Sequence, residues 1–183
     1  MSDKPPSLDL IVRPCFQQDL ELVQIIYAHH VLSGAGTFET EPPDLEEITR
    51  RWSEIVERGW PYLVAAPRSD MTRVLGFAYA RPFRDRAAYA LSFEDSIYVA
   101  PTAQRQGVGV ALLAQLISML KTDGARELIA VIGDSKNEGS IGLHARAGFQ
   151  PCGLLQNVGY KFGAWHDVVL MQRSLAPASP TGK

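Results

Sequence analysis

Several features that often reveal a protein's class are scarce in this sequence. Its 183 residues include only two cysteines, Cys15 and Cys152, which are too few for a disulfide framework and show no metal-ligand spacing. No apolar run approaches the roughly 20 residues that a membrane-spanning helix needs. The N-terminal segment MSDKPPSLDL lacks the basic and then apolar order of a secretory signal. We therefore expect a reduced, cytoplasmic protein without a metal.

The chain also lacks an excess of either charge. It has 18 Lys and Arg residues against 20 Asp and Glu residues, and a protein without a basic excess is a poor candidate for nucleic-acid binding. With 46% hydrophobic and 21% charged residues, the composition is typical of a globular protein that does not bind a membrane. The length predicts one domain. We place that domain at residues 8–175, after a flexible start at 1–7 and before a disordered tail at 176–183.

Hydrophobic periodicity predicts alternating strands and helices. The helix at 44–59 is the most clearly bounded, because Asp44 and Glu47 form a capping-box pattern at its start. The order β-α-α-β-β-β-α-β-α-β-β predicts a mixed α/β sheet. The expected elements are a strand at 8–13, helices at 19–32 and 44–59, strands at 62–66, 74–80 and 91–99, a helix ending at 124, a strand at 127–132, a helix at 137–148, and strands around 154 and at 167–173, joined by a connection at 159–165.

Residues 96–113 combine a strand, a glycine-bearing loop and the start of a helix. The first N–H groups of a helix have no partner within the helix, and its dipole favours negative charge there. Gly107 and Gly109 remove side chains that would keep a phosphate from those groups. The alternative is that the glycines only ease a tight turn. The spacing fits neither a P-loop nor a dinucleotide-binding fingerprint.

Glu94 lies within the strand just before this loop. Strand alternation places it on one face with Ser96 and Tyr98. There it is either an exposed charge or the wall of a cleft. In a cleft, the carboxylate would be a general base, since an amine must lose a proton to attack an acyl group. The same alternation sends Asp95 to the opposite face, where we expect it to be structural or exposed.

Several motifs resemble those of a known enzyme family. Gln104-x-x-Gly107-x-Gly109, after a strand that ends at Val99, resembles the acetyl-CoA-binding motif of the GNAT acyltransferases. The segments 37–42, 93–99, 130–137 and 158–168 look like the phosphinothricin acetyltransferase branch, and the similarity runs from about 11 to 175. It implies the GNAT fold, with a mixed, mostly antiparallel sheet flanked by helices.

The resemblance also implies an activity. Enzymes of this branch transfer acetyl from acetyl-CoA to the α-amino group of phosphinothricin, methionine sulfoximine or methionine sulfone, without a metal, and this implies a role in resistance to such compounds. Glu94 matches their proposed general base, which acts while both substrates are bound. Relatives are commonly homodimers with the acceptor site near the interface. Tyr160 and Trp165 are then packing or dimer-contact residues.

The resemblance implies a set of cofactor contacts. Backbone N–H groups of about 106–110 would hold the pyrophosphate, and Arg105 would add charge. A backbone N–H of Ile97 or Tyr98, freed by a bulge in the strand, would stabilise the oxyanion. Asn137 is a helix cap that GNAT proteins also use to contact the cofactor. The predicted contacts are Ile97, Tyr98, Val99, Gln104, Arg105, Gln106, Gly107, Val108, Gly109, Val110, Asn137 and Ser140.

His144 stands where many GNAT proteins have a tyrosine that protonates the departing thiolate. An imidazolium would serve equally near neutral pH, and a histidine without a catalytic role is the alternative. For the acceptor, Arg81 is the nearest cation for a carboxylate, or else a solvated strand end. Phe38, Phe83 and Tyr89 would wall the side-chain pocket.

Two rival functions remain open. One keeps the fold and changes the acceptor to a protein N-terminus or a polyamine, although the basic segment 81–86 suits a polyamine poorly. The other is a CoA-binding sensor or scaffold without turnover, against which the combination of Glu94 and the glycine loop argues.

Overall fold

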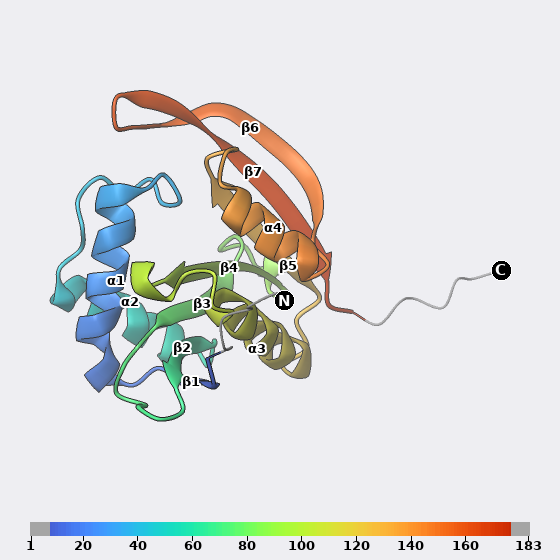
Figure 1. Cartoon of the computed structure of the whole chain (residues 1–183). Helices are drawn as coiled ribbons and strands as arrows, with labels where there is room; N and C mark the ends of the chain where they lie inside the picture. Colours follow the sequence, from blue (N-terminus) through green and yellow to red (C-terminus); the bar gives the residue numbers. More distant parts are fainter. Residues whose placement is uncertain (1–7, 177–183) are drawn as a thin grey trace, which may run out of the picture.

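The computed structural model describes residues 8–176, so the predicted flexible start and residues 177–183 of the predicted tail lie outside the described part. Within that part a seven-stranded sheet has the order β1-β2-β3-β4-β5-β7-β6 (Figure 1). Neighbouring strands are antiparallel except for the parallel pair β4 and β5. The elements are β1 Leu10–Pro14, α1 Leu20–Ser33, α2 Leu45–Glu57, β2 Tyr62–Pro67, β3 Gly76–Pro82, β4 Ser92–Val99, α3 Val108–Thr122, β5 Glu127–Gly133, α4 Glu138–Arg146, β6 Gln150–Lys161 and β7 Ala164–Ser174.

The predicted order of strands and helices is confirmed, and one predicted connection is wrong. Residues 159–165 are not a loop, because β6 continues to Lys161 and β7 begins at Ala164. Only Phe162 and Gly163 join them, with φ of 51° and 75°, as a two-residue hairpin turn of type I′ requires. Gly159, the first residue of the predicted connection, lies within β6.

The sheet separates two hydrophobic cores. Leu112, Leu116 and Leu120 of α3 lie in one core with Phe93 and Leu128, because they recur at the four-residue spacing that keeps one helix face against the sheet. Residues of α1 and α2 form the other core with Val64 and Phe77 of the sheet. Figure 1 accordingly shows α1 and α2 on one side of the sheet and α3 and α4 on the other.

A gap opens in the middle of the sheet. The pairing of β4 with β5 ends at Asp95 and Ala130, while β5 continues beside β7 to Gly133. No bulge interrupts β4 against β3, since their register is unbroken from Pro82–Phe93 to Gly76–Val99. The predicted bulge is therefore wrong for this pair of strands, and the predicted alternation of β4 holds. The gap comes from strand divergence.

Between residues 8 and 176, no helix has the length and apolar character that a membrane span requires.

Candidate active site

Two cavities meet where β4 leaves β5. The first, of about 670 Å³, lies between the glycine loop and α4, and we call it the α4 cavity. The second, of about 630 Å³, lies between the sheet and α2, and we call it the α2 cavity. Ser96, Tyr98 and Val131 line both cavities. Two molecules bound one in each cavity would therefore meet at β4.

The glycine loop forms the open end of the α4 cavity. Gly107 is the N-cap of α3 with φ of 87° and no side-chain capping bond, a left-handed conformation that favours glycine. The first amides of α3 thus remain free of a capping side chain at the cavity. Gln106 does not line the cavity, because its side chain turns away to donate to the Thr102 carbonyl at 2.8 Å. The other predicted cofactor residues all line it: Ile97, Tyr98, Val99, Gln104, Arg105, Gly107, Val108, Gly109, Val110, Asn137 and Ser140.

Asn137 is the N-cap of α4. Its Oδ1 accepts a hydrogen bond from the Ser140 amide at 3.1 Å, as expected for a cap. Because the residue also lines the α4 cavity, the capping role and a contact with a bound molecule are compatible. The sequence analysis left both roles of Asn137 possible.

A buried acid–base pair forms the wall of the α4 cavity opposite the glycine loop. His144 Nε2 lies 2.9 Å from Asp95 Oδ2, and His144 Nδ1 lies 2.8 Å from the Ser140 carbonyl oxygen. The two side chains are only 4% and 2% exposed. Burial alone would lower the pKa of His144, but the Asp95 carboxylate and the Ser140 carbonyl outweigh it, and the net pKa lies above its ordinary value.

This geometry refines two predictions. Asp95 was expected to be either structural or exposed; it is buried, which favours the structural alternative. His144 does line the cavity, although both of its ring nitrogens already have partners. Asp95 Oδ1 is buried without a partner among the described residues.

The direction of the backbone groups distinguishes the two predicted oxyanion donors. Phe83 N–H donates to the Ser92 carbonyl and Ala100 N–H to the Leu75 carbonyl, each at 2.9 Å. Backbone groups of the even-numbered residues of β4 therefore face β3, and those of the odd-numbered residues face β5. Tyr98 N–H thus faces β3. Ile97 N–H faces β5 beyond the last paired residue, so it is directed into the gap.

Glu94 and Arg81 lie side by side on the floor of the α2 cavity. They are paired across β3 and β4, and Arg81 Nη2 is 3.8 Å from Glu94 Oε1. The Glu94 side chain is 17% exposed and that of Arg81 is 59% exposed. Burial raises the pKa of Glu94 above its ordinary value, Arg81 acts to lower it, and Asp95 adds to the rise. A carboxylate so placed is a stronger base than an exposed one.

Aromatic rings line the α2 cavity, but not all are the predicted ones. Phe38 lines it as expected. Phe83 and Tyr89 do not; their rings pack against each other at 6.1 Å, and Tyr89 is 38% exposed. Both follow the end of β3 at Pro82, in a segment of which Asp85 lines the cavity. The walls come instead from Trp60, Tyr62, Phe77, Tyr79 and Tyr98.

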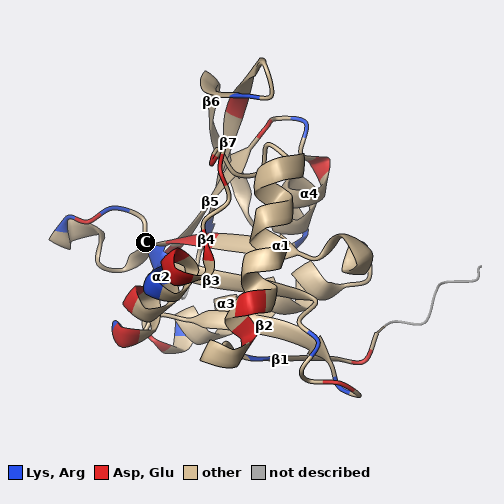
Figure 2. Cartoon of the chain, turned by 90° about the vertical axis from the view of Figure 1, so that its left-hand side faces the viewer, with Lys and Arg blue, Asp and Glu red and all other residues tan. Residues whose placement is uncertain are grey.

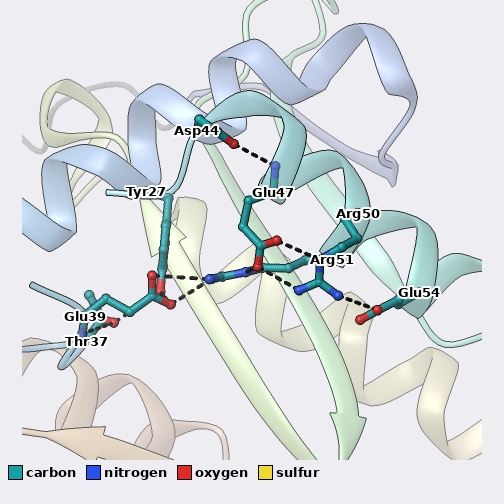
Figure 3. A network of polar contacts seen from close by, with 8 residues as sticks. All are labelled: Tyr27, Thr37, Glu39, Asp44, Glu47, Arg50, Arg51 and Glu54. Carbon is teal, nitrogen blue, oxygen red and sulfur yellow. Dashed lines mark hydrogen bonds and ion pairs between the residues drawn. The ribbon is translucent and has the colours of Figure 1, made fainter. Parts of the chain in front are cut away.

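An ionic network connects the loop after α1 to α2 along the same cavity (Figure 3). Glu39 Oε1 accepts hydrogen bonds from Arg51 Nη1 at 2.7 Å and from the Tyr27 hydroxyl at 2.8 Å. Arg51 Nε donates to Glu47 at 2.7 Å. Figure 2 shows acidic and basic residues side by side along α2. This wall of the cavity is therefore charged but largely self-neutralised.

The loop is also held from the other side of the cavity. Lys161, 3% exposed, donates to the carbonyls of Gly34 and Thr37, each at 2.8 Å. A Cβ on Gly159 would overlap the Phe38 ring. Residues 34–39 are thus docked on the β6–β7 hairpin.

Sequence reasoning missed several lining residues. Glu39 stands in the segment 37–42 that carries the family resemblance, but no role followed for it. His30 had no predicted role, yet it lines the α4 cavity and contacts the Val99 carbonyl oxygen at 2.9 Å. The aromatic residues of β2 and β3 had no predicted role, because nothing in a single sequence separates a core ring from a cavity ring.

Comparison with known proteins identifies the family. The profile of the acetyltransferase (GNAT) family matches residues 24–149. The chain belongs to the GNAT family. The predicted fold class is thereby confirmed, with its mixed seven-stranded sheet within residues 8–176.

Relatives of this GNAT chain are similar over most of their length. A protein from Alcaligenes faecalis named phosphinothricin N-acetyltransferase is 46% identical over 93% of this chain and 85% of its own. A protein from Pseudomonas aeruginosa named L-methionine sulfoximine/L-methionine sulfone acetyltransferase is 33% identical over 91% and 95%. The crystal structure of a phosphinothricin acetyltransferase from Sinorhizobium meliloti in complex with acetyl-CoA has a TM-score of 0.87, with 40% identity over 91% of this chain and 89% of that one.

The chain is an acetyl-CoA-dependent N-acetyltransferase. The α4 cavity fits this cofactor, since free helix amides and Arg105 suit phosphates and the cavity continues to the gap beside Glu94. The described residues include no group of three His, Cys, Asp or Glu side chains placed to hold a metal ion.

Proposed function

We propose that this GNAT enzyme acetylates the α-amino group of an amino-acid analogue such as phosphinothricin, methionine sulfoximine or methionine sulfone, with Glu94 as the general base. The relatives' names support this class of acceptor. The observation that carries the proposal for this chain is the pairing of Glu94 with Arg81 in the α2 cavity. An α-amino acid carries an amine and a carboxylate one carbon apart, and this pair offers a base and a guanidinium at matching separation.

The proposed chemistry is direct transfer between molecules bound in the two cavities. Acetyl-CoA supplies the activated acetyl group as a thioester. Glu94 removes a proton from the acceptor ammonium, directly or through a water, so that the neutral amine attacks. Ile97 N–H stabilises the oxyanion, because it is the backbone donor directed into the gap. Arg81 binds the acceptor carboxylate and keeps the amine at Glu94.

The departing thiolate takes its proton from water or from His144. Asp95 favours the second route, because its carboxylate raises the pKa of the imidazole. Transfer from Nε2 then requires the hydrogen bond to Asp95 to break, since both ring nitrogens are already engaged.

For the cofactor, we propose that the amides at 107–110 and Arg105 hold the pyrophosphate. Asn137 and Ser140 contact the pantetheine arm from the start of α4. Gln104 and the backbone of 97–99 complete the α4 cavity on the side of β4. Gln106 contributes its amide rather than its side chain.

We also propose that the enzyme is a homodimer in the cytoplasm that confers resistance to toxic amino-acid analogues. Both cysteines are free thiols, as in reducing compartments. β6 is an edge strand of the sheet, and an apolar edge strand favours association. The exposed apolar side chains of the β6–β7 hairpin are Leu154, Leu155, Val158, Tyr160, Phe162 and Trp165.

A thiol-release assay with acetyl-CoA tests the function. The proposal predicts turnover with phosphinothricin, methionine sulfoximine or methionine sulfone, and little with spermidine or an N-terminal peptide. Turnover confined to the polyamine or the peptide would contradict it. Acetyl-CoA binding by calorimetry without thiol release from any acceptor would indicate a sensor instead.

A further inference from the structure

The α2 cavity offers little unpaired positive charge to an acceptor that carries a second anionic group besides its α-carboxylate. Five carboxylates and four guanidinium groups line it. Arg51 is fully engaged, because Nη1 and Nη2 lie 2.7 and 3.4 Å from the two oxygens of Glu39 while Nε donates to Glu47. Arg50 is likewise paired with Glu47 and Glu54. Neither guanidinium is free for a bound molecule.

The other two guanidinium groups that line the cavity belong to Arg81 and Arg58, and neither is available to the acceptor's side chain. Arg81 is adjacent to Glu94, so in the proposed function it takes the α-carboxylate. Arg58 follows the end of α2 and stacks over the Trp60 ring at 5.1 Å. It is exposed, and water therefore screens its charge.

With its amine and carboxylate at Glu94 and Arg81, the acceptor would extend its side chain into the rest of the α2 cavity, whose lining includes Glu39 and Arg51. Tyr79 lies two residues before Arg81 on the same face of β3, and it lines the α2 cavity together with Glu94, Glu39 and Arg51. Among the carboxylates that line this cavity, Glu39 is the one held by both Arg51 and Tyr27.

We propose that Glu39, held by Arg51 and Tyr27, selects acceptors with an uncharged side chain, so that methionine sulfoximine and methionine sulfone are acetylated in preference to phosphinothricin. This rests on the proposed function. Phosphinothricin and methionine sulfoximine share one carbon skeleton, but the phosphinate is an anion and the sulfoximine is neutral. The anion meets the Glu39 carboxylate, whereas a sulfoximine N–H donates to it.

Steady-state kinetics with the three acceptors test this preference. The wild type has a kcat/KM about tenfold higher for methionine sulfoximine and methionine sulfone than for phosphinothricin, as expected for one like-charge contact in a partly solvated cavity. Glu39→Gln raises the value for phosphinothricin relative to methionine sulfoximine by about tenfold. A loosened loop would lower all three values together, so the ratio isolates the charge.

A matched control removes a carboxylate elsewhere. Glu57 is exposed at the end of α2 and does not line the cavity, so Glu57→Gln leaves the ratio unchanged. Glu39→Gln also releases the Arg51 guanidinium from its ion pair, so the double variant Glu39→Gln with Arg51→Met should lose the part of the phosphinothricin gain that the released guanidinium adds.

Distinct results separate this proposal from the proposed function. A wild type that prefers phosphinothricin, or a ratio that Glu39→Gln leaves unchanged, would overturn the selectivity of Glu39. A gain that persists without Arg51 would overturn the part given to Arg51. No turnover with any of the three acceptors would overturn the proposed function itself, and the preference with it.

Discussion

At the scale of single residues, the proposed mechanism gives Arg81 an effect on both the acceptor and the base. Its guanidinium lowers the pKa of Glu94, against the larger effect of burial. If Glu94 is the general base, it must be ionised to accept a proton, so activity should be lost as the pH falls through its pKa. A change at Arg81 therefore affects the pH dependence as well as acceptor binding.

Arg81→Met should raise the acceptor KM roughly tenfold or more, because a charge-assisted hydrogen bond is lost. It should also move the acidic limb of the kcat/KM profile to higher pH, since the pKa of Glu94 rises further. Profiles against pH check both effects, with Arg86→Met as the control. An acidic limb that stays in place or moves to lower pH would contradict the pairing.

The Asp95–His144 pair links residue charge to stability. Asp95 and the Ser140 carbonyl raise the pKa of His144. The stabilisation that the pair provides is therefore complete below the pKa of histidine in the unfolded chain, about 6.5. It is lost as the pH rises through the pKa of His144 in the folded protein. Asp95→Asn should destabilise the protein by about 3 kcal/mol, because it breaks a buried ion pair. Urea unfolding at several pH values should show the largest difference from the wild type at low pH. An equal difference at all pH values would show that the pair is not charged.

At the scale of elements, the loop 34–39, which carries lining residues of the α2 cavity, docks on the β6–β7 hairpin. Gly159 of β6 leaves room for the Phe38 ring. Lys161 two residues later fixes the loop carbonyls. Strand alternation places both residues on the same face, so one stretch of β6 positions one wall of the α2 cavity.

Gly159→Ala should displace Phe38 and lower kcat/KM for the acceptor, with a loss of about 1–3 kcal/mol of stability, as overpacking causes. Gly153→Ala is the matched control, because its Cβ would only touch the Leu170 side chain at 3.4 Å. Acceptor kinetics and thermal unfolding of the two variants check this. Equal behaviour of the two variants would mean that the loop does not depend on this contact.

The order of the elements could be predicted from the sequence, because helix caps and periodicity are local signals. Asp44 illustrates this, as its carboxylate accepts from the Glu47 amide at 2.9 Å. The divergence of β4 from β5 could not be predicted, since it depends on pairing between distant segments. The hairpin turn at 162–163 could not be predicted, because glycine is rare inside strands and Gly159 is nevertheless a buried residue of β6.

Some features of the candidate site could likewise be predicted from the sequence, and others could not. The glycine loop and Glu94 follow a contiguous motif and strand alternation, so the sequence places them. The partner of His144 lies 49 residues away, and the partners of Glu39 lie on two different helices. Such contacts arise only from the tertiary fold.

At the scale of the whole molecule, the β6–β7 hairpin extends from the body of the protein (Figure 1). Trp165 and Phe162 are 63% and 61% exposed, although such rings are usually at least partly covered. Because the same hairpin holds the loop 34–39, an interface on it would lie close to the acceptor site.

Trp165→Asp should shift the protein from dimer to monomer, since a charge replaces an apolar contact at the proposed interface. Light scattering on the purified protein measures the mass directly. Met71, 52% exposed in the turn before β3, gives a control in Met71→Asp. A wild type with the mass of one chain would contradict the dimer.

The central claim is that Glu94 is the base of an acetyl transfer. The most direct measurement compares Glu94→Gln with the wild type under saturating methionine sulfoximine and acetyl-CoA, with acetyl-CoA affinity measured by calorimetry. Glu94→Gln should lower kcat by about 10²–10⁴-fold, the range for loss of a general base, while acetyl-CoA affinity stays unchanged. A kcat equal to that of the wild type at neutral pH would show that another group removes the proton.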